Sequence, residues 1–287
     1  MTSAMINWIA TAWDALQNNS GFMTWNLFLA LVPLGLSFWL FHLPRSRTLR
    51  WGVPLLIGAT FLPNAQRVFR HGFYLLQKMG TNYLFWVLLL TLVVMALEIW
   101  QLRRQQSISR SLLWWLGFVT FVAFLPNAPY VLTDVIHLIE DIRQGYSVWI
   151  ITLALIPQYL LFTIIGFEAY VLSLIHLGYY LKRWGWGQFV GPAELLLHGL
   201  TAIGIHLGRF QRFNSWDILT DPDALVRSVM NDLVGKRPAV VMAVTFVVIT
   251  VLYWLCKELT LAVLHRQQSA TDRIEAIADS ESSQAHS

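Results

Sequence analysis

Long apolar stretches alternate with short polar segments along this chain. The clearest apolar runs are Asn26–Phe41, Tyr83–Trp100 and Val240–Cys256. A helix needs roughly 17–25 such residues to cross the ~30 Å hydrocarbon core of a bilayer. The pattern therefore predicts an all-α, polytopic transmembrane helix bundle of about seven spans. We expect these spans at residues 25–42, 50–65, 82–101, 111–127, 147–168, 192–208 and 238–256.

One apolar stretch, Tyr146–Leu181, does not fit a single simple span. As one helix it would measure about 54 Å, which exceeds the bilayer core, yet it is too short for two spans and a turn. We expect one long helix that protrudes from the membrane, with a kink near Pro157 or Gly166. A helix broken at that point is the alternative.

Changes in composition divide the chain into three parts. We predict an N-terminal interfacial segment at 1–24, a transmembrane domain at 25–264, and a polar tail at 265–287. The tail contains no aromatic residue, and its composition is typical of disorder.

The transmembrane domain contains a candidate internal repeat. A shift of 63 residues places Phe61–Ala65 on Phe124–Ala128, both with the sequence FLPNA, and gives copies at about 51–113 and 114–176. Chance alignment of abundant residues is the alternative. Each copy holds two spans, so the copies would lie parallel in the membrane, as repeats do in some transporters.

Composition supports the membrane assignment. Of the 287 residues, 56% are hydrophobic and 13% are charged, whereas soluble domains carry about 25% charged residues. The single cysteine, Cys256, excludes an intramolecular disulfide and a thiol metal site. The net charge of +4 gives no reason to expect a nucleic-acid partner.

The polar segments that follow the second, fourth and sixth spans emerge on one side of the membrane. The opposite loops carry tight arginine clusters, at Arg45–Arg50 and Arg103–Arg104. Cytoplasmic loops are enriched in Lys and Arg, so we expect the motif-bearing face to be extracytoplasmic.

The first motif follows the fourth span. Pro126 and Pro129 should end that helix, and Asn127 can cap the next one. The continuation to Gln144 is amphipathic and predicts a helix lying in the membrane interface. Its polar stripe holds Thr133, His137, Glu140 and Gln144, with Asp134 and Asp141 beside it, whereas Val131, Val135, Leu138 and Ile142 face away.

Asp134 and His137 are the candidate catalytic residues of this motif. They are three residues apart, so both side chains can reach one proton or one divalent metal ion. They then form an acid–base pair or two ligands of a metal cofactor. The alternatives are solvated groups on an interfacial helix, or an aspartate that only orients the histidine.

The second motif follows the sixth span, where Arg209 and Arg212 alternate with aromatic residues. Arginine suits bidentate contact with carboxylate or phosphate, so these two residues are a candidate anion site. Interfacial anchoring, with the arginines paired to Asp217 or Asp134, is the alternative. The full set of candidate ligand-binding residues is Asn127, Tyr130, Thr133, Arg209, Arg212, Asn214, Trp216 and Asp217.

Further polar residues lie near these motifs. In the first repeat copy, Asn64 is followed by Arg67, Arg70 and His71, and a salt bridge from Asp134 to Arg70 or Arg209 is a simple consequence. Ionisable residues inside spans are costly and tend to face the bundle interior. They are Glu168, His176, Glu194, His198 and His206, which form either a proton or substrate path or ordinary packed contacts.

The two motifs carry a family resemblance. Phe124–Leu138 (FLPNAPYVLTDVIHL) and Gly208–Asp217 (GRFQRFNSWD) resemble the signatures of a bacterial membrane family known as domain of unknown function 1361, and Trp25–Pro33 (WNLFLALVP) is similar to it too. The resemblance covers roughly Trp25 to Val234 and implies a multi-pass protein of the bacterial cytoplasmic membrane. Gln211 departs from the pattern, where an apolar residue is expected. The family brings no activity with it.

Three functions therefore remain open. The leading hypothesis is binding or processing of an anionic, amphiphilic ligand, such as a lipid headgroup or a lipid-linked substrate, at the motif-bearing face. The second is a small-solute or proton-coupled transporter, and the third is a membrane scaffold without a ligand. No P-loop, nucleophile elbow, HExxH zinc motif or dinucleotide fingerprint occurs. The sequence leaves open whether the protein is an enzyme and which oligomer it forms.

Overall fold

The computed structural model describes residues 2–41, 47–62, 65–66, 70, 112–211, 227–228 and 236–285. Its regular elements are all helices, and no strand occurs in these ranges. The helices are α1 (Thr2–Leu40), α2 (Arg47–Phe61), α5 (Leu112–Phe124), α6 (Asn127–Tyr130), η2 (Val131–Asp134), α7 (Val135–Arg143), α8 (Val148–Ile150), η3 (Ile151–Leu155), α9 (Ile156–Arg183), η4 (Gly187–Phe189), α10 (Val190–Phe210) and α13 (Lys236–Ala285).

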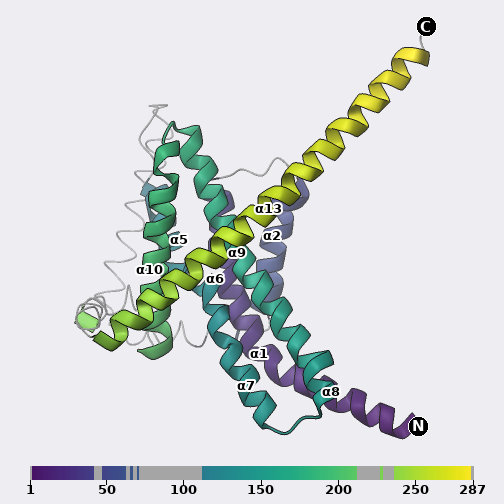
Figure 1. Cartoon of the computed structure of the whole chain (residues 1–287), viewed down its shortest axis with the longest axis vertical. Coiled ribbons are helices and arrows are strands. Elements are labelled where there is room, and N and C mark those ends of the chain that lie inside the picture. The colour runs from purple at the N-terminus through teal and green to yellow at the C-terminus, as the bar shows by residue number, and fades with distance from the viewer. Residues whose placement is uncertain are drawn as a thin grey trace.

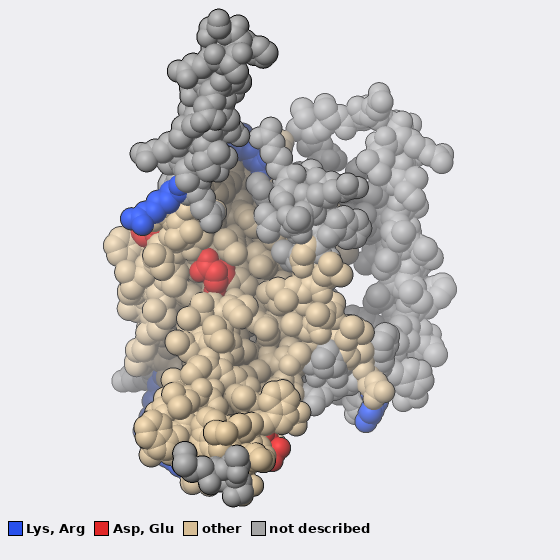
Figure 2. Space-filling view, turned by 90° about the vertical axis from the view of Figure 1, so that its right-hand side faces the viewer, with Lys and Arg blue, Asp and Glu red and all other residues tan. Residues whose placement is uncertain are grey.

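Several helical stretches are long and apolar enough to cross a membrane, so the predicted all-α, multi-pass membrane fold is confirmed. Among the described residues there are 5: Met5–Leu40, Trp114–Arg143, Val148–Arg183, Gly187–Phe210 and Arg237–Leu264. On the face shown in Figure 2, the described surface is almost entirely uncharged, as a lipid-facing surface should be.

The predicted number of about seven spans stays a prediction. The second predicted span corresponds to α2, which has 15 residues and measures about 22 Å, less than the hydrocarbon core. The third, at 82–101, lies outside the described residues. Helices α2 and α5 end at Phe61 and Phe124, which are equivalent positions in the proposed repeat. Most of the first copy is not described, so the duplication is also untested.

Helix α1 is the central helix of the bundle. It packs along α9 and also contacts α2, α5 and α6, while α13 crosses the bundle obliquely over α9 and α10 (Figure 1). The core between α1, α5 and α9 is aromatic. The ring of Phe41 lies 5.1 Å from that of Phe121 and 5.4 Å from that of Tyr180. Such contacts add to the hydrophobic free energy of burying the rings.

Two glycines bring the segment after α5 close to its neighbours. A Cβ atom on Gly166 of α9 would lie 2.8 Å from Val131, and one on Gly204 of α10 would lie 2.6 Å from Pro126. Both distances are far below van der Waals contact, so only glycine admits this packing. The short helices α6 and η2 are thereby held between α9 and α10.

The expected long helix is present, and it changes its winding near Pro157. Helices α8, η3 and α9 follow one another without interruption, and η3 (Ile151–Leu155) is a π-helical turn directly before this proline. Proline has no N–H to donate and crowds the preceding turn, and a wider π turn relieves both problems. Gly166, the other predicted kink position, is a close-packing site instead.

The segment from Val131 through α7 is only partly arranged as the sequence predicts. Asp134 and Asp141 are 1% and 8% exposed and point into the bundle, whereas Val135 is 53% and Ile142 is 45% exposed. The other positions do not follow this division, because Val131 is 0% exposed and the side chain of Glu140 is 59% exposed. The buried aspartates find hydrogen-bond partners inside the bundle. The placement of this helix in the membrane interface stays a prediction.

The polar tail is helical in this structure. Helix α13 continues to Ala285, through the segment at 265–287 for which the composition predicts disorder. This part projects away from the bundle in Figure 1. A helix without packing partners is marginal in water, so the predicted disorder of the tail remains a prediction for the protein in solution.

Candidate functional site

The site begins where α5 ends. Helix α5 stops at Phe124, two residues before Pro126, as the sequence predicts. The side-chain Nδ2 of Asn127 donates to the carbonyl of Phe124 at 3.0 Å. Asn127 thus caps the end of α5, and the prediction that it caps the start of the next helix is wrong. The chain then runs through α6 and η2 into α7.

Asp134 is the buried centre of this region. Its side chain is 1% exposed. Its Oδ2 accepts a hydrogen bond from Nδ2 of Asn26 on α1 at 2.7 Å. Its Oδ1 lies 3.7 Å from Nη1 of Arg209 on α10. The second distance is too long for a hydrogen bond, so the contact with Arg209 is a loose ion pair.

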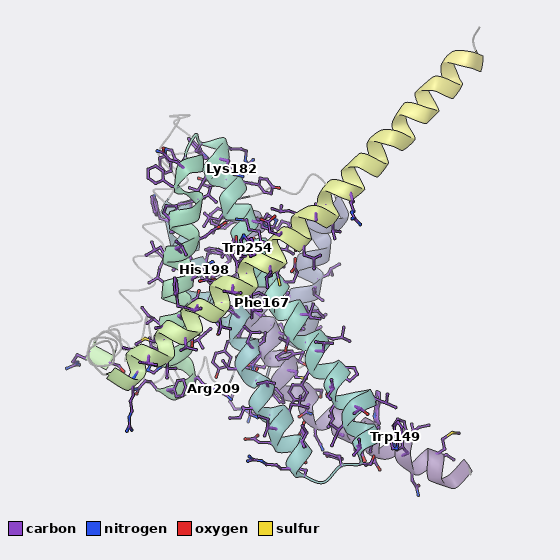
Figure 3. All side chains as sticks on the ribbon, in the orientation of Figure 1. Trp149, Phe167, Lys182, His198, Arg209 and Trp254 are labelled. Atoms are coloured by element: carbon purple, nitrogen blue, oxygen red, sulfur yellow. The ribbon has the colours of Figure 1, made fainter. Side chains whose placement is uncertain are left out.

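Arg209 reaches this carboxylate from the last turn of α10. Its Nη2 donates to the carbonyl of Thr133 at 3.3 Å, and its Cζ lies 5.9 Å from the centroid of the Tyr130 ring. The Thr133 hydroxyl donates to the Tyr130 carbonyl at 2.7 Å and fixes this turn. The arginine side chain remains 22% exposed, and Figure 3 shows it between the end of α10 and α6–α7.

Asp141 forms a second, similar contact with α1. Its Oδ2 accepts hydrogen bonds from Nδ2 of Asn19 at 2.6 Å and from the Tyr159 hydroxyl at 3.1 Å. Asn19 and Asn26 are two helical turns apart, and so are Asp134 and Asp141. Because α1 and the α6–α7 segment run antiparallel, both Asn–Asp pairs can form at once. We call them the Asn26–Asp134 clasp and the Asn19–Asp141 clasp.

His137 makes its own hydrogen bond on the exposed side of α7. Its Nδ1 is 2.9 Å from Oε2 of Glu140, and its ring lies 4.7 Å from the ring of Phe22. Its side chain is 37% exposed. Asp134 and His137 therefore have separate partners. Within the described ranges no group of three or more His, Cys, Asp or Glu could hold a metal ion, and the two-ligand metal site stays a prediction.

The structure brings four of the predicted residues together: Tyr130, Thr133, Asp134 and Arg209. The predicted salt bridge from Asp134 to Arg209 is present. Others lie outside the described residues, and their placement stays a prediction. These are Asn64, Arg67, His71, Arg212, Asn214, Trp216 and Asp217.

Asn26 is the residue that the sequence interpretation missed. Its signal was present, because an asparagine in an apolar span is costly unless it has a partner. The spacing of Asn19 and Asn26 matches that of the two aspartates, but spacing alone does not assign the pairs.

A second polar cluster lies in the interior between α9, α10 and α13. Oε1 of Glu194 accepts hydrogen bonds from Nζ of Lys257 at 2.6 Å and from the Tyr253 hydroxyl at 2.7 Å. Nδ1 of His198 lies 2.6 Å from the Tyr170 hydroxyl, and Figure 3 shows His198 on the inner side of α10. These groups satisfy one another across three helices.

Asp134 and Arg209 differ in their access to solvent. Asp134 has almost no access to solvent and is held by Asn26 and Arg209, so it cannot readily take a proton from a substrate. Arg209 is partly exposed, and its planar guanidinium has more N–H donors than its two contacts use. The arrangement is therefore suited to holding an oxyanion.

Comparison with known proteins gives one match. The family model described as "Protein of unknown function (DUF1361)" matches residues 86–251, which is more than half of the chain. This range includes α5 through α10 and the first part of α13. No curated protein and no solved structure matches the chain.

Proposed function

The chain belongs to the DUF1361 family, and from that premise we propose that it binds an anionic, amphiphilic ligand at the membrane face where Arg209 meets α6 and η2. A lipid headgroup or a lipid-linked substrate is the proposed ligand. We further propose that the membrane is the bacterial cytoplasmic membrane and that this face is extracytoplasmic. The observation that carries the proposal is the partly exposed guanidinium of Arg209, which is 3.7 Å from Asp134.

The guanidinium retains capacity for a ligand. It has five N–H donors in a planar fork, and one described hydrogen bond, from Nη2 to the Thr133 carbonyl, uses this fork. The Tyr130 ring lies beside it at 5.9 Å, which favours a cation there. An oxyanion can bind the exposed edge without breaking these contacts.

The surroundings favour an amphiphile over a small soluble anion. Val135, Ile136 and Ile139 form the outer side of α7 and are 53%, 44% and 46% exposed. Phe210, next to Arg209, is 60% exposed. An acyl chain can lie on these side chains while its headgroup reaches Arg209, because lipid and apolar side chains share one environment.

If the ligand is processed as well as bound, His137 is the better of the two candidate catalytic residues. Its ring is partly exposed, and Glu140 holds Nδ1, which leaves the other nitrogen available for a proton. Asp134 would then act only through its charge. We base the proposal on binding, because the contacts that carry it are those of Arg209.

A transporter is the second candidate, and the buried cluster of Glu194, Lys257 and His198 favours it. Ionisable groups inside a bundle often mark ion or proton pathways. The third candidate, a scaffold, requires only that the same contacts lock helices together. Uptake that depends on Glu194 but not on Arg209 would favour transport, and variants that change only stability would favour the scaffold.

Binding of phosphatidic acid to the purified protein tests the proposal. We expect Arg209→Ala to weaken this binding by on the order of tenfold or more, because charge-assisted hydrogen bonds are worth about 1.5–3 kcal/mol. Arg143→Ala is the matched control, since Arg143 is an exposed arginine in the last turn of α7. Native mass spectrometry of both variants measures the affinities. Equal binding by the two variants would refute the proposal.

A further inference from the structure

We infer that Asp134 is a built-in counter-anion of the Arg209 site, and that it sets how strongly the site holds an anionic headgroup. This inference rests on the proposed function, since it concerns the same ligand. It assigns Asp134 a role in ligand affinity instead of catalysis.

The first step is a comparison of two matched aspartates. Asp134 and Asp141 are both buried, and each accepts a hydrogen bond from an asparagine of α1, at 2.7 Å and 2.6 Å. Their second partners differ. Asp134 faces the guanidinium of Arg209, whereas Asp141 accepts from the neutral hydroxyl of Tyr159, and no ion pair to Asp141 occurs within the described ranges. Only Asp134 can influence a bound anion through an arginine.

The second step is the geometry of the pair. At 3.7 Å the carboxylate does not consume an N–H donor of Arg209 in a hydrogen bond. Asn26 fixes the carboxylate, which is almost fully buried, so water screens its charge poorly. Asp134 therefore acts on an incoming anion mainly by partly neutralising the positive charge of Arg209.

The third step concerns the charge of the ligand. Because Asp134 does not occupy the N–H donors of Arg209, a phosphate or a carboxylate can bind the exposed donors while Asp134 stays in place. A phosphate monoester carries about −1.5 to −2 charges, so Asp134 repels it more strongly than it repels a carboxylate with one charge. Asp134 therefore lowers the affinity for a phosphate most, and the apolar residues of α7 favour a phosphate on a lipid.

Asp134→Asn tests the role of the charge. The substitution keeps the size of the side chain and leaves an oxygen to accept from Asn26. We expect it to raise the affinity for phosphatidic acid on the order of tenfold, because it removes a negative charge several ångströms from the phosphate. Asp141→Asn, the matched control, should leave the affinity unchanged. Native mass spectrometry of the intact chain measures both.

Each outcome separates the inference from the proposed function. If Arg209→Ala has no effect on phosphatidic acid binding, the proposed function fails and the inference falls with it. If Arg209→Ala weakens binding but Asp134→Asn leaves it at or below the wild-type affinity, the proposed function stands and the inference is overturned. An equal gain from Asp141→Asn would also overturn it, since the effect would not depend on Arg209.

Oleate, an amphiphile with a carboxylate head, tests the dependence on ligand charge. We expect Asp134→Asn to raise the affinity for oleate less than it raises the affinity for phosphatidic acid, because oleate carries less negative charge. An equal or larger gain for oleate would contradict a role of Asp134 through its charge. Glycerol phosphate, which lacks acyl chains, should bind much more weakly than phosphatidic acid. Equally tight binding of glycerol phosphate would overturn the lipid as the source of the phosphate.

Discussion

Two ion pairs on α10 are built in opposite ways. Near the start of the helix, Glu194 contacts Lys257 at 2.6 Å, and Tyr253 adds a second donor to the same oxygen. At the end of the helix, Arg209 and Asp134 are 3.7 Å apart. The first pair is closed by two short hydrogen bonds, whereas the second is open, because the carboxylate does not occupy an N–H donor of the guanidinium. Lys257 and Arg209 are equally exposed, at 22%, so the difference lies in the contacts of the two pairs and not in their burial. For this reason the proposed binding site is the open pair.

Removal of the closed pair should have the largest effect on stability. Glu194→Leu leaves the ammonium of Lys257 without its carboxylate, which we expect to cost about 3 kcal/mol. The double variant Glu194→Leu/Lys257→Leu should recover most of that loss, because two apolar side chains need no partner in the bundle. Unfolding of the purified protein in denaturant measures both variants. If Glu194→Leu is as stable as the wild type, the contact between Glu194 and Lys257 does not stabilise the fold.

The packing that forms the open pair is the next target. Gly204→Ala places a Cβ atom 2.6 Å from Pro126 and should cost about 1–3 kcal/mol by overpacking. It should also weaken phosphatidic acid binding, because α6 and α10 can no longer approach closely. Gly199→Ala on the same helix meets nothing within 4 Å, so it should be neutral or slightly stabilising. Identical behaviour of the two variants would contradict the packing account.

The smallest effect should come from the Asn19–Asp141 clasp. Tyr159→Phe removes one hydrogen bond to Asp141 and should cost about 1 kcal/mol. Lipid binding should not change, because this clasp does not contact Arg209. Tyr179→Phe, at an exposed tyrosine of the same helix, is the control for stability. Altered lipid binding by Tyr159→Phe would mean that the two clasps do not act separately.

The sequence was sufficient for much of the fold. Apolar run lengths predicted a helical membrane protein, and they predicted the sixth span at 192–208, where α10 runs from Val190 to Phe210. The prolines predicted the end of α5. These features are local, since they depend on run length and on the missing N–H of proline.

The orientation of α7 could not be predicted from the same pattern. Periodicity groups the acidic residues, but it does not say which of them face the protein, and Asp134 and Asp141 are buried whereas Glu140 is exposed. In a bilayer the exterior is apolar, so acids such as Asp134 and Asp141 turn inward when a neighbouring helix offers donors. Those donors, Asn19 and Asn26, lie more than a hundred positions away in the chain. Only the tertiary structure reveals the pairing.

The proximity of Asp134 and Arg209 was predicted, but its meaning changes with the geometry. The spacing of Asp134 and His137 indicated an acid–base pair or a metal site. In the structure Asp134 is turned toward Asn26 and Arg209, and His137 toward Glu140. Side-chain direction depends on tertiary contacts, which the spacing of two residues does not give.

A cryo-electron microscopy structure of the protein in bilayer discs containing phosphatidic acid is the most direct test of the Arg209 site. We predict a lipid phosphate within hydrogen-bonding distance of the Arg209 guanidinium, with Asp134 still bound to Asn26 behind it. A map with ordered lipid phosphates elsewhere and none at Arg209 would contradict the account.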